Sequence, residues 1–232
     1  MIKVDNFEQA FHKKVILKNI NFEIQEGEIV GLLGPSGSGK TTLIKALIGL
    51  RKSTGGEVSV LGERQPSLKQ MKQIGYMAQA DALYEELTAK ANLAYFGRLY
   101  GLKGKRLHER IDTCLRFVNL DQEAKKPVHA YSGGMKRRLS LAIALIHRPK
   151  LIFLDEPTVG IDPALKRVFW DEFEHLRNEG MTFLISTHVM DEAERCDRIL
   201  LIRNGTLIDG GTPKELIQQY GSIEQAFLKV GE

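Results

Sequence analysis

Short apolar runs and helical spacing alternate along most of the chain. Nearly continuous apolar runs occur at 28–33, 151–154 and 182–186, and runs of this length are typical of strands buried on both faces of a sheet. Apolar residues recur at helical spacing within 41–50, and the span 163–178 also favours a helix. Strand, helix and strand in this order predict parallel βαβ units. The pattern therefore indicates an α/β protein with a mostly parallel sheet.

The regions around this core have other patterns. Short β-like runs before residue 25 predict an antiparallel β subdomain at the N-terminus, and 81–144 is mostly of helical character, which predicts an inserted helical subdomain. Two apolar runs flank Asn204-Gly205, a dipeptide typical of a two-residue hairpin turn. Residues 213–229 predict a helical tail.

Composition narrows the class of protein. The chain has 232 residues, of which 43% are apolar and 27% charged, close to globular averages. The apolar stretch 139–146 is far shorter than the ~18 residues of a membrane helix, and the N-terminus lacks the apolar core of a signal peptide. The two cysteines, Cys114 and Cys196, are too few for a disulfide framework or a metal cluster. We expect a soluble, reduced, cytosolic protein, with Cys114 buried on the apolar face of its helix.

The charge is mildly basic. Lys and Arg number 33 against 29 Asp and Glu, a formal net charge of +4. The densest basic runs lie at 136–138 and 103–106, and we interpret them as a solvated face, with a polyanion or anionic-lipid site as the alternative. No nucleic-acid partner is expected.

A glycine-rich stretch follows the first apolar run. Residues 34–41 match the phosphate-loop pattern G-x-x-x-x-G-K-[ST] in full. Glycines let several backbone N–H groups point at one phosphate, and the helix that follows adds its positive end. Lys40 supplies a point charge and Thr41 a hydroxyl for Mg²⁺. The alternative is a flexible Gly-Ser turn. The predicted phosphate contacts are Gly34, Pro35, Ser36, Gly37, Ser38, Gly39, Lys40, Thr41 and Thr42.

Two acids end the apolar run at 151–154. Ligands of open α/β sheets bind at the carboxyl ends of the strands, so Asp155 is expected to hold Mg²⁺ directly or through water. Glu156 is placed to deprotonate a water that attacks the γ-phosphate. Taken without the phosphate loop, both would be ordinary solvated acids at a strand end; together with it they predict an NTPase site.

One further segment distinguishes among phosphate-loop proteins. The loop alone leaves GTPases, kinases, helicases and transport ATPases open, and the guanine-reading Asn-Lys-x-Asp motif is absent from the sequence. Residues 131–138 read Tyr-Ser-Gly-Gly-Met-Lys-Arg-Arg and lead through an apolar helix into the carboxylate strand. With these residues the chain resembles the ATP-binding-cassette (ABC) ATPases over nearly its whole length.

The resemblance assigns nucleotide contacts to residues far apart in the sequence. By position in the family's motifs these are the signature residues Ser132, Gly133 and Gly134, the Q-loop Gln79, the D-loop Asp162, the switch histidine His188 and the adenine-stacking Phe11. It implies that Gln79 contacts Mg²⁺ or water, and that His188 contacts the γ-phosphate and holds the attacking water, with Glu156 as the base. Without the resemblance, Gln79, His188 and Phe11 would be interpreted as surface or packing residues, as are the remaining histidines.

A second anion site is predicted at the start of the helix that follows Ser132-Gly133-Gly134. The phosphate loop already supplies the anion site that one ATP needs within the chain, so the second site needs another phosphate. The resemblance resolves this with a head-to-tail dimer, in which Ser132 and Gly134 complete the site on Lys40 of the other chain. It further implies ATP and Mg²⁺ as cofactors and a separate transmembrane permease as partner. The protein would then work at the cytoplasmic face of the membrane, with 82–87 facing the permease.

The motifs at 131–138, 158–163 and 187–194 resemble those of bacterial exporter ATPases. The chain also departs from the commonest family pattern: Tyr131 and Met135 stand where Leu and Gln are commoner, Phe11 replaces Tyr, and Ser-Ala-Leu is missing before Asp162. The resemblance implies a single cassette, with 1–80 and 150–212 as nucleotide-binding core, 81–149 as helical subdomain and 213–232 as tail. Two alternatives stay open: a soluble ABC ATPase acting on a cytosolic assembly, and a small-molecule kinase. The transported substrate and the choice between homodimer and heterodimer do not follow from the sequence.

Overall fold

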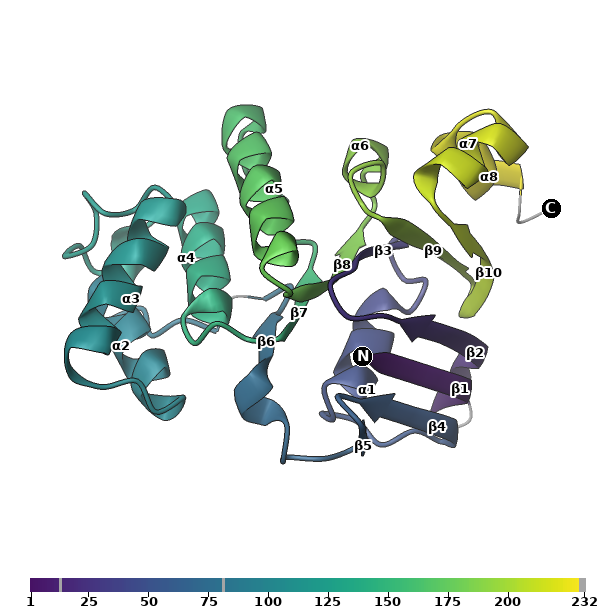
Figure 1. Ribbon diagram of the computed structural model, residues 1–232, viewed down its shortest axis with the longest axis horizontal. Helices are drawn as coiled ribbons and strands as arrows, with labels where there is room; N and C mark the ends of the chain where they lie inside the picture. The colour runs from purple at the N-terminus through teal and green to yellow at the C-terminus, as the bar shows by residue number, and fades with distance from the viewer. Residues whose placement is uncertain (13, 81, 230–232) are drawn as a thin grey trace.

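The computed structural model describes residues 1–12, 14–80 and 82–229 (Figure 1). Asp81 and residues 230–232, which the sequence places at the start of the helical subdomain and in the tail, lie outside the described residues. The strands are β1 (Ile2–Phe11), β2 (Lys14–Ile24), β3 (Ile29–Leu33), β4 (Gly55–Val60), β5 (Glu63–Arg64), β6 (Ile74–Met77), β7 (Leu151–Asp155), β8 (Thr182–Thr187), β9 (Arg198–Arg203) and β10 (Thr206–Gly211). The α-helices are α1 (Lys40–Leu47), α2 (Ala89–Leu99), α3 (Gly104–Phe117), α4 (Gly133–Leu145), α5 (Pro163–Asn178), α6 (Met190–Ala193), α7 (Pro213–Tyr220) and α8 (Ile223–Lys229).

A six-stranded sheet forms the centre, in the order β10-β9-β3-β8-β7-β6. All neighbouring pairs are parallel except β9 with β10. Every residue of β3 and β7 is buried, which explains why their sequences show continuous apolar runs. The parallel arrangement brings the carboxyl ends of β3, β7 and β8 to one edge of the sheet, where the polar motifs follow the strands.

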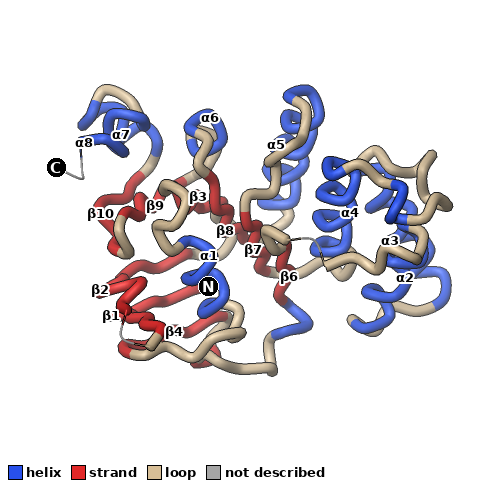
Figure 2. The backbone as a smooth tube through the Cα atoms, turned by 180° about the vertical axis from the view of Figure 1, so that it is seen from behind, coloured by secondary structure: helices blue, strands red, loops and turns tan. Residues whose placement is uncertain are grey.

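A second, antiparallel sheet, ordered β2-β1-β4-β5, lies beside the first (Figures 1 and 2). Its inner side chains, the apolar face of α1 and one face of the central sheet share a buried cluster that includes Phe7, Leu43, Leu47 and Phe153. Helix α1 therefore lies between the two sheets, and its N-terminus is held firmly where β3 ends. The predicted antiparallel β subdomain is confirmed.

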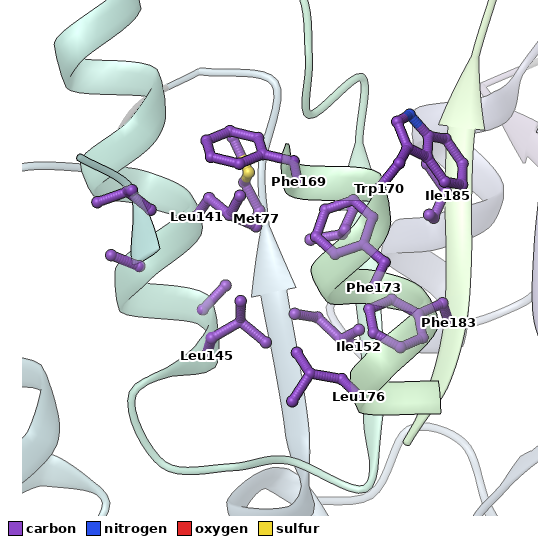
Figure 3. Packing of buried hydrophobic residues seen from close by; sticks show 14 of the residues in the cluster. Met77, Leu141, Leu145, Ile152, Phe169, Trp170, Phe173, Leu176, Phe183 and Ile185 are labelled. Atoms are coloured by element: carbon purple, nitrogen blue, oxygen red, sulfur yellow. The ribbon is translucent and has the colours of Figure 1, made fainter. Parts of the chain in front are cut away.

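The other face of the central sheet packs against helices. Phe169, Trp170 and Phe173 of α5 are buried against Phe183 of β8 and other sheet residues (Figure 3). This cluster continues into α2, α3 and α4, which form the helical subdomain at the end of the molecule beyond β6 (Figures 1 and 2). Helix α4 thus belongs to the helical subdomain and also packs on the core strand β6.

Several element boundaries differ from the sequence predictions. The helix expected at 41–50 begins at Lys40 and ends at Leu47, with Gly49 at a φ of 77° just beyond it. The helical region 81–144 contains long non-helical connections, and the tail is two helices because Gly221 adopts a φ of 93° between them. The hairpin at Asn204-Gly205 and the helix over Pro163–Asn178 are confirmed. No helix in the described part of the chain has the length and apolar character needed to cross a membrane.

Candidate nucleotide site

The phosphate loop connects β3 to α1, and close contacts require glycine at two of its positions, Gly34 and Gly39. A Cβ at Gly34 would lie 2.4 Å from the Ile202 carbonyl oxygen, and a Cβ at Gly39, where φ is 106°, would lie 2.6 Å from Cδ2 of Leu17. Gly37, at a φ of 80°, has open space on that side. Gly34 and Gly39 therefore let the loop pack tightly against β9 and β2, and the N-terminus of α1 that follows the loop is a favourable place for a phosphate.

Lys40 lies inside this loop, with its side chain 5% exposed. Its Nζ donates hydrogen bonds to the carbonyl oxygens of Gly34 (2.7 Å) and Pro35 (3.0 Å) and lies 3.7 Å from Oε1 of Glu156. Burial lowers the pKa of Lys40, and the charges of Glu156 and Asp155 oppose that shift. A buried ammonium with a carboxylate partner nearby is well placed to exchange its carbonyl contacts for phosphate oxygens.

The carboxylate of Asp155, at the end of β7, is enclosed by hydroxyl groups. Asp155 is 1% exposed, and its carboxylate accepts hydrogen bonds from Oγ1 of Thr41 (2.7 Å) and Oγ of Ser186. Thr41 and Asp155 are 114 positions apart in sequence, and their hydroxyl and carboxylate oxygens are ligand types that suit Mg²⁺. The donor set therefore fits the metal that the sequence predicts here.

Glu156 takes an unusual backbone conformation. Its φ is 53°, in the left-handed region, and its N–H donates to the backbone oxygen and to Oγ of Ser186, each at 3.1 Å. The turn directs the carboxylate toward Nδ1 of His188, which lies 3.3 Å from Oε1 of Glu156. Strained conformations of this kind cluster at functional sites. The sequence contains no signal for this turn, because Glu has no preference for positive φ.

A cavity of about 150 Å³ lies at the phosphate loop. It is lined by Ile16, Ser36, Gly37, Gly39, Lys40, Thr41, Thr42, Gln79 and Glu156. Gln79 follows β6 and reaches the cavity from the side of the helical subdomain. His188 follows β8 and is half exposed beside Glu156. The structure thus brings together the predicted phosphate, metal and acid–base residues from the ends of four strands.

The predicted signature residues lie elsewhere. Ser132 caps α4, since its Oγ accepts a hydrogen bond from the N–H of Met135 (3.2 Å), and Asp162 caps α5 in the same way through Leu165 (3.0 Å). Both belong to a separate open hollow of about 530 Å³ that Gly134 also lines. Gly133 is exposed at the first turn of α4. The two cavities share no lining residue, so these groups do not meet the phosphate loop of their own chain.

Phe11 ends β1 and is half-buried. The guanidinium carbon of Arg51 lies 4.4 Å from the centre of its ring, a cation–π distance. Phe11 does not line the phosphate-loop cavity, whereas Ile16, from the neighbouring strand, does. Arg51 was not predicted from the sequence, because no motif surrounds it.

The interpretation of 136–138 as a solvated face is wrong. Arg137 is 7% exposed, and its guanidinium donates to the carbonyl oxygens of Ala78 (2.7 Å) and Gln79 (2.9 Å). Helical spacing contains the signal that was missed, because Arg137 lies four and eight residues before the buried Leu141 and Leu145 and so shares their face. The second basic run, 103–106, is exposed as predicted.

The cysteine and histidine side chains discussed next have packing or surface positions. Among the described residues, no group of three or more His, Cys, Asp or Glu side chains could hold a metal ion. Cys114 is buried as expected, and burial raises the pKa of its thiol to about 11. His147 stacks on Tyr100, with ring centres 3.6 Å apart, whereas the remaining histidines are exposed, namely His12, His108, His129 and His175.

Comparison with known proteins shows the family of the chain. The sequence profile of the ABC transporter family matches residues 17–159. The Nod factor export ATP-binding protein I of Sinorhizobium fredii is 42% identical over 94% of this chain, and the linearmycin resistance ATP-binding protein LnrL of Bacillus subtilis is 39% identical over 98%. The chain spans 64% of the length of the first of these relatives and 78% of the second.

Solved structures show the same architecture. An ATP-binding subunit of an ABC transporter superposes with a TM-score of 0.92 at 28% identity, covering 100% of both chains. A dimeric cassette in a post-hydrolysis state with ADP and Pi superposes with a TM-score of 0.84 at 28% identity, over 91% of this chain and 98% of that one. The fold is that of an ABC ATPase cassette. The chain belongs to the ABC transporter family.

Proposed function

We propose that this protein is the ATP-binding and ATP-hydrolysing subunit of an ABC exporter that works through a separate permease. One observation carries the proposal: Lys40, Glu156 and His188 converge beside the hydrogen-bonded pair Thr41–Asp155 at the mouth of the phosphate loop. A phosphate site, a metal-binding oxygen pair and an acid–base pair within contact distance of one another are the components that nucleotide hydrolysis needs.

Each side chain has a role that its position supports. Lys40 and the loop amides bind the β- and γ-phosphates, and Thr41, Asp155 and Gln79 would hold Mg²⁺ (Gln79 directly or through water). Mg²⁺ supplies neutralisation of phosphate charge when bound. Glu156 accepts the proton of the attacking water, and His188 orients Glu156 and the water. The ion pair of Lys40 with Glu156 keeps the base close to the γ-phosphate position before nucleotide arrives.

A head-to-tail dimer accounts for the second hollow. Ser132 and Gly134 lie at the N-terminus of α4, in a hollow separate from their own phosphate loop, and Asp162 lines the same hollow. In a two-fold dimer this hollow would cover the phosphate loop of the partner, giving two equivalent sites. The solved dimeric cassette that shares this fold supports that arrangement. We propose a homodimer or a pair with a related cassette, with Phe11 next to the adenine.

An apolar groove between the core and the helical subdomain fits a permease. It has a volume of about 170 Å³ and is lined in part by Tyr76, Leu83 and Phe96. Tyr84 and Leu87, in the neighbouring 82–87 segment, are 47% and 39% exposed. Apolar side chains gathered in this way mark a protein contact. The functions of both relatives, export and drug resistance, favour an exporter at the cytoplasmic face of the membrane.

Trapping the ATP-bound state tests this proposal. Glu156→Gln keeps the phosphate loop but removes the base, so ATP binding persists, turnover falls to a low residual rate and the dimer accumulates. Purification of this variant from native membranes with ATP should recover a polytopic permease in stoichiometric amount. Lys40→Ala, purified in the same way, is the matched control and should recover less of it. A soluble complex without a membrane protein would support a cytosolic ABC ATPase, and an unchanged hydrolysis rate would exclude Glu156 as the base.

A further inference from the structure

Arg137 connects three parts of the molecule that are remote in sequence. Its side chain leaves α4 on the buried face, and one guanidinium nitrogen donates to the carbonyls of Ala78 and Gln79. The other donates to the carbonyls of Asp155 and Glu156, at 2.6 Å in the case of Glu156. A planar, rigid fork of donors can bridge two segments in this way, whereas a lysine ammonium presents a single point.

The segments that it bridges carry the side chains of the nucleotide cavity. Gln79 and Glu156 both line that cavity, and Arg137 holds the main-chain oxygen of each. The strained turn at Glu156 is held on its N–H side by Ser186 and on its carbonyl side by Arg137. Because a left-handed Glu is stable only where its surroundings determine it, loss of one side should let the carboxylate move.

Helix α4, which carries Arg137, also reaches the second hollow and the apolar groove. The helix begins at Gly133 beside the second hollow, and Arg137 lies about 6 Å further along its axis. Ile143 and Ala144 of the same helix line the apolar groove next to Ala78. One helix therefore touches the hollow, the catalytic turn and the groove, so any rotation of α4 relative to β7 must move the guanidinium against the carbonyls that it binds.

We propose that Arg137 is a positioning residue for ATP hydrolysis, which ties the backbone of Gln79 and Glu156 to α4 and makes their alignment depend on the position of that helix. The proposal rests on the proposed ATPase function. The proposal also requires that the coupling works in both directions. A partner that moves α4 at the groove changes the placement of Glu156, and a nucleotide that fixes Glu156 restrains α4.

Substitution of Arg137 in the full chain tests the proposal. Arg137→Gln and Arg137→Lys should lower kcat by about 10- to 100-fold, because a misplacement of about 1 Å in a reacting group has an effect of this size. The Kd for ATP, measured by titration, should stay within about threefold, since the phosphate loop is untouched. Arg137→Lys keeps the charge and some hydrogen bonding, and it should fold even where the glutamine variant does not.

Arg110 offers a matched control. It is also a partly buried arginine that donates to two main-chain carbonyls, those of Leu145 (2.8 Å) and Ile146 (3.0 Å), but at the opposite end of α4. Arg110→Gln should lower the melting temperature by about as much as Arg137→Gln while leaving kcat within about twofold of the unmodified chain. Equal loss of kcat in the two variants would overturn the proposal, as would unchanged kcat in both Arg137 variants.

A double-substitution cycle separates positioning from general disruption. If Arg137 acts through Glu156, then Arg137→Gln should cause little further loss of residual turnover in a Glu156→Gln background. Full, additive loss in that background would contradict the proposal. The outcome for the proposed ATPase activity is distinct, because that activity is contradicted if the unmodified chain does not hydrolyse ATP or if Glu156→Gln alone leaves the rate unchanged.

Discussion

Acid should destabilise this protein through one partly buried histidine, His147. The ring lies just beyond the end of α4, stacked on Tyr100 with an interplanar angle of 3°, and its Nε2 lies 3.1 Å from the Ile74 carbonyl oxygen. Burial lowers the pKa of His147 to about 4 from an ordinary value of 6.5; the Ile74 contact opposes the shift and Arg110 adds to it. The folded protein therefore holds this ring neutral where the unfolded chain protonates it.

The sign and the size of this destabilisation follow from the difference in proton binding between the folded and unfolded states. Between pH 6.5 and about 4 the unfolded state binds more protons, so the free energy of unfolding falls as the pH falls through this window and is unaffected by His147 above it. A shift from 6.5 to about 4 corresponds to about 3 kcal/mol when fully expressed, and to about 2.5 kcal/mol at about pH 4.5. That is a large part of the stability of a typical domain.

Denaturant unfolding at about pH 7.5 and about pH 4.5, without nucleotide, measures this effect. In the His147→Gln variant the side chain at this position does not titrate. Between the two pH values, the free energy of unfolding of the variant should therefore fall by about 2 kcal/mol less than that of the unmodified protein. His175→Gln, at a histidine that is 62% exposed on α5, is the matched control and should keep the unmodified pH dependence. An identical pH dependence in the unmodified and His147→Gln proteins would refute the reasoning.

Three other substitutions test the site and the core. Lys40→Ala removes the cation from the phosphate loop, so ATP binding and turnover should both be lost; tight ATP binding in a titration would contradict the phosphate assignment. Ser132→Arg places a long side chain at the second hollow, so the monomer should still bind ATP while hydrolysis stops; surviving activity would contradict the cross-chain site. Phe173→Ala empties a fully buried position between α5 and β8 and should lower the free energy of unfolding by about 3–5 kcal/mol, as urea unfolding would show.

Sequence alone was enough for the features that depend on contiguous residues. The phosphate loop, the hairpin at Asn204-Gly205 and the helix over Pro163–Asn178 were predicted because each is specified by local backbone preferences. The parallel core followed from apolar runs, since a strand buried on both faces needs them. The cavity residues Lys40 and Glu156 were likewise found from motifs that lie at strand ends.

Tertiary structure decided what depends on contacts between distant segments. The bond between Thr41 and Asp155, the left-handed turn at Glu156 and the packing of Arg51 on Phe11 arise only when the sheets and helices assemble. Arg137 shows the difference most clearly: a basic run ordinarily faces water, but main-chain carbonyls of two other segments satisfy this guanidinium. Helical spacing places Arg137 on the buried face of α4, but a buried charge also needs partners, and only the fold brings the carbonyls of these two segments to it.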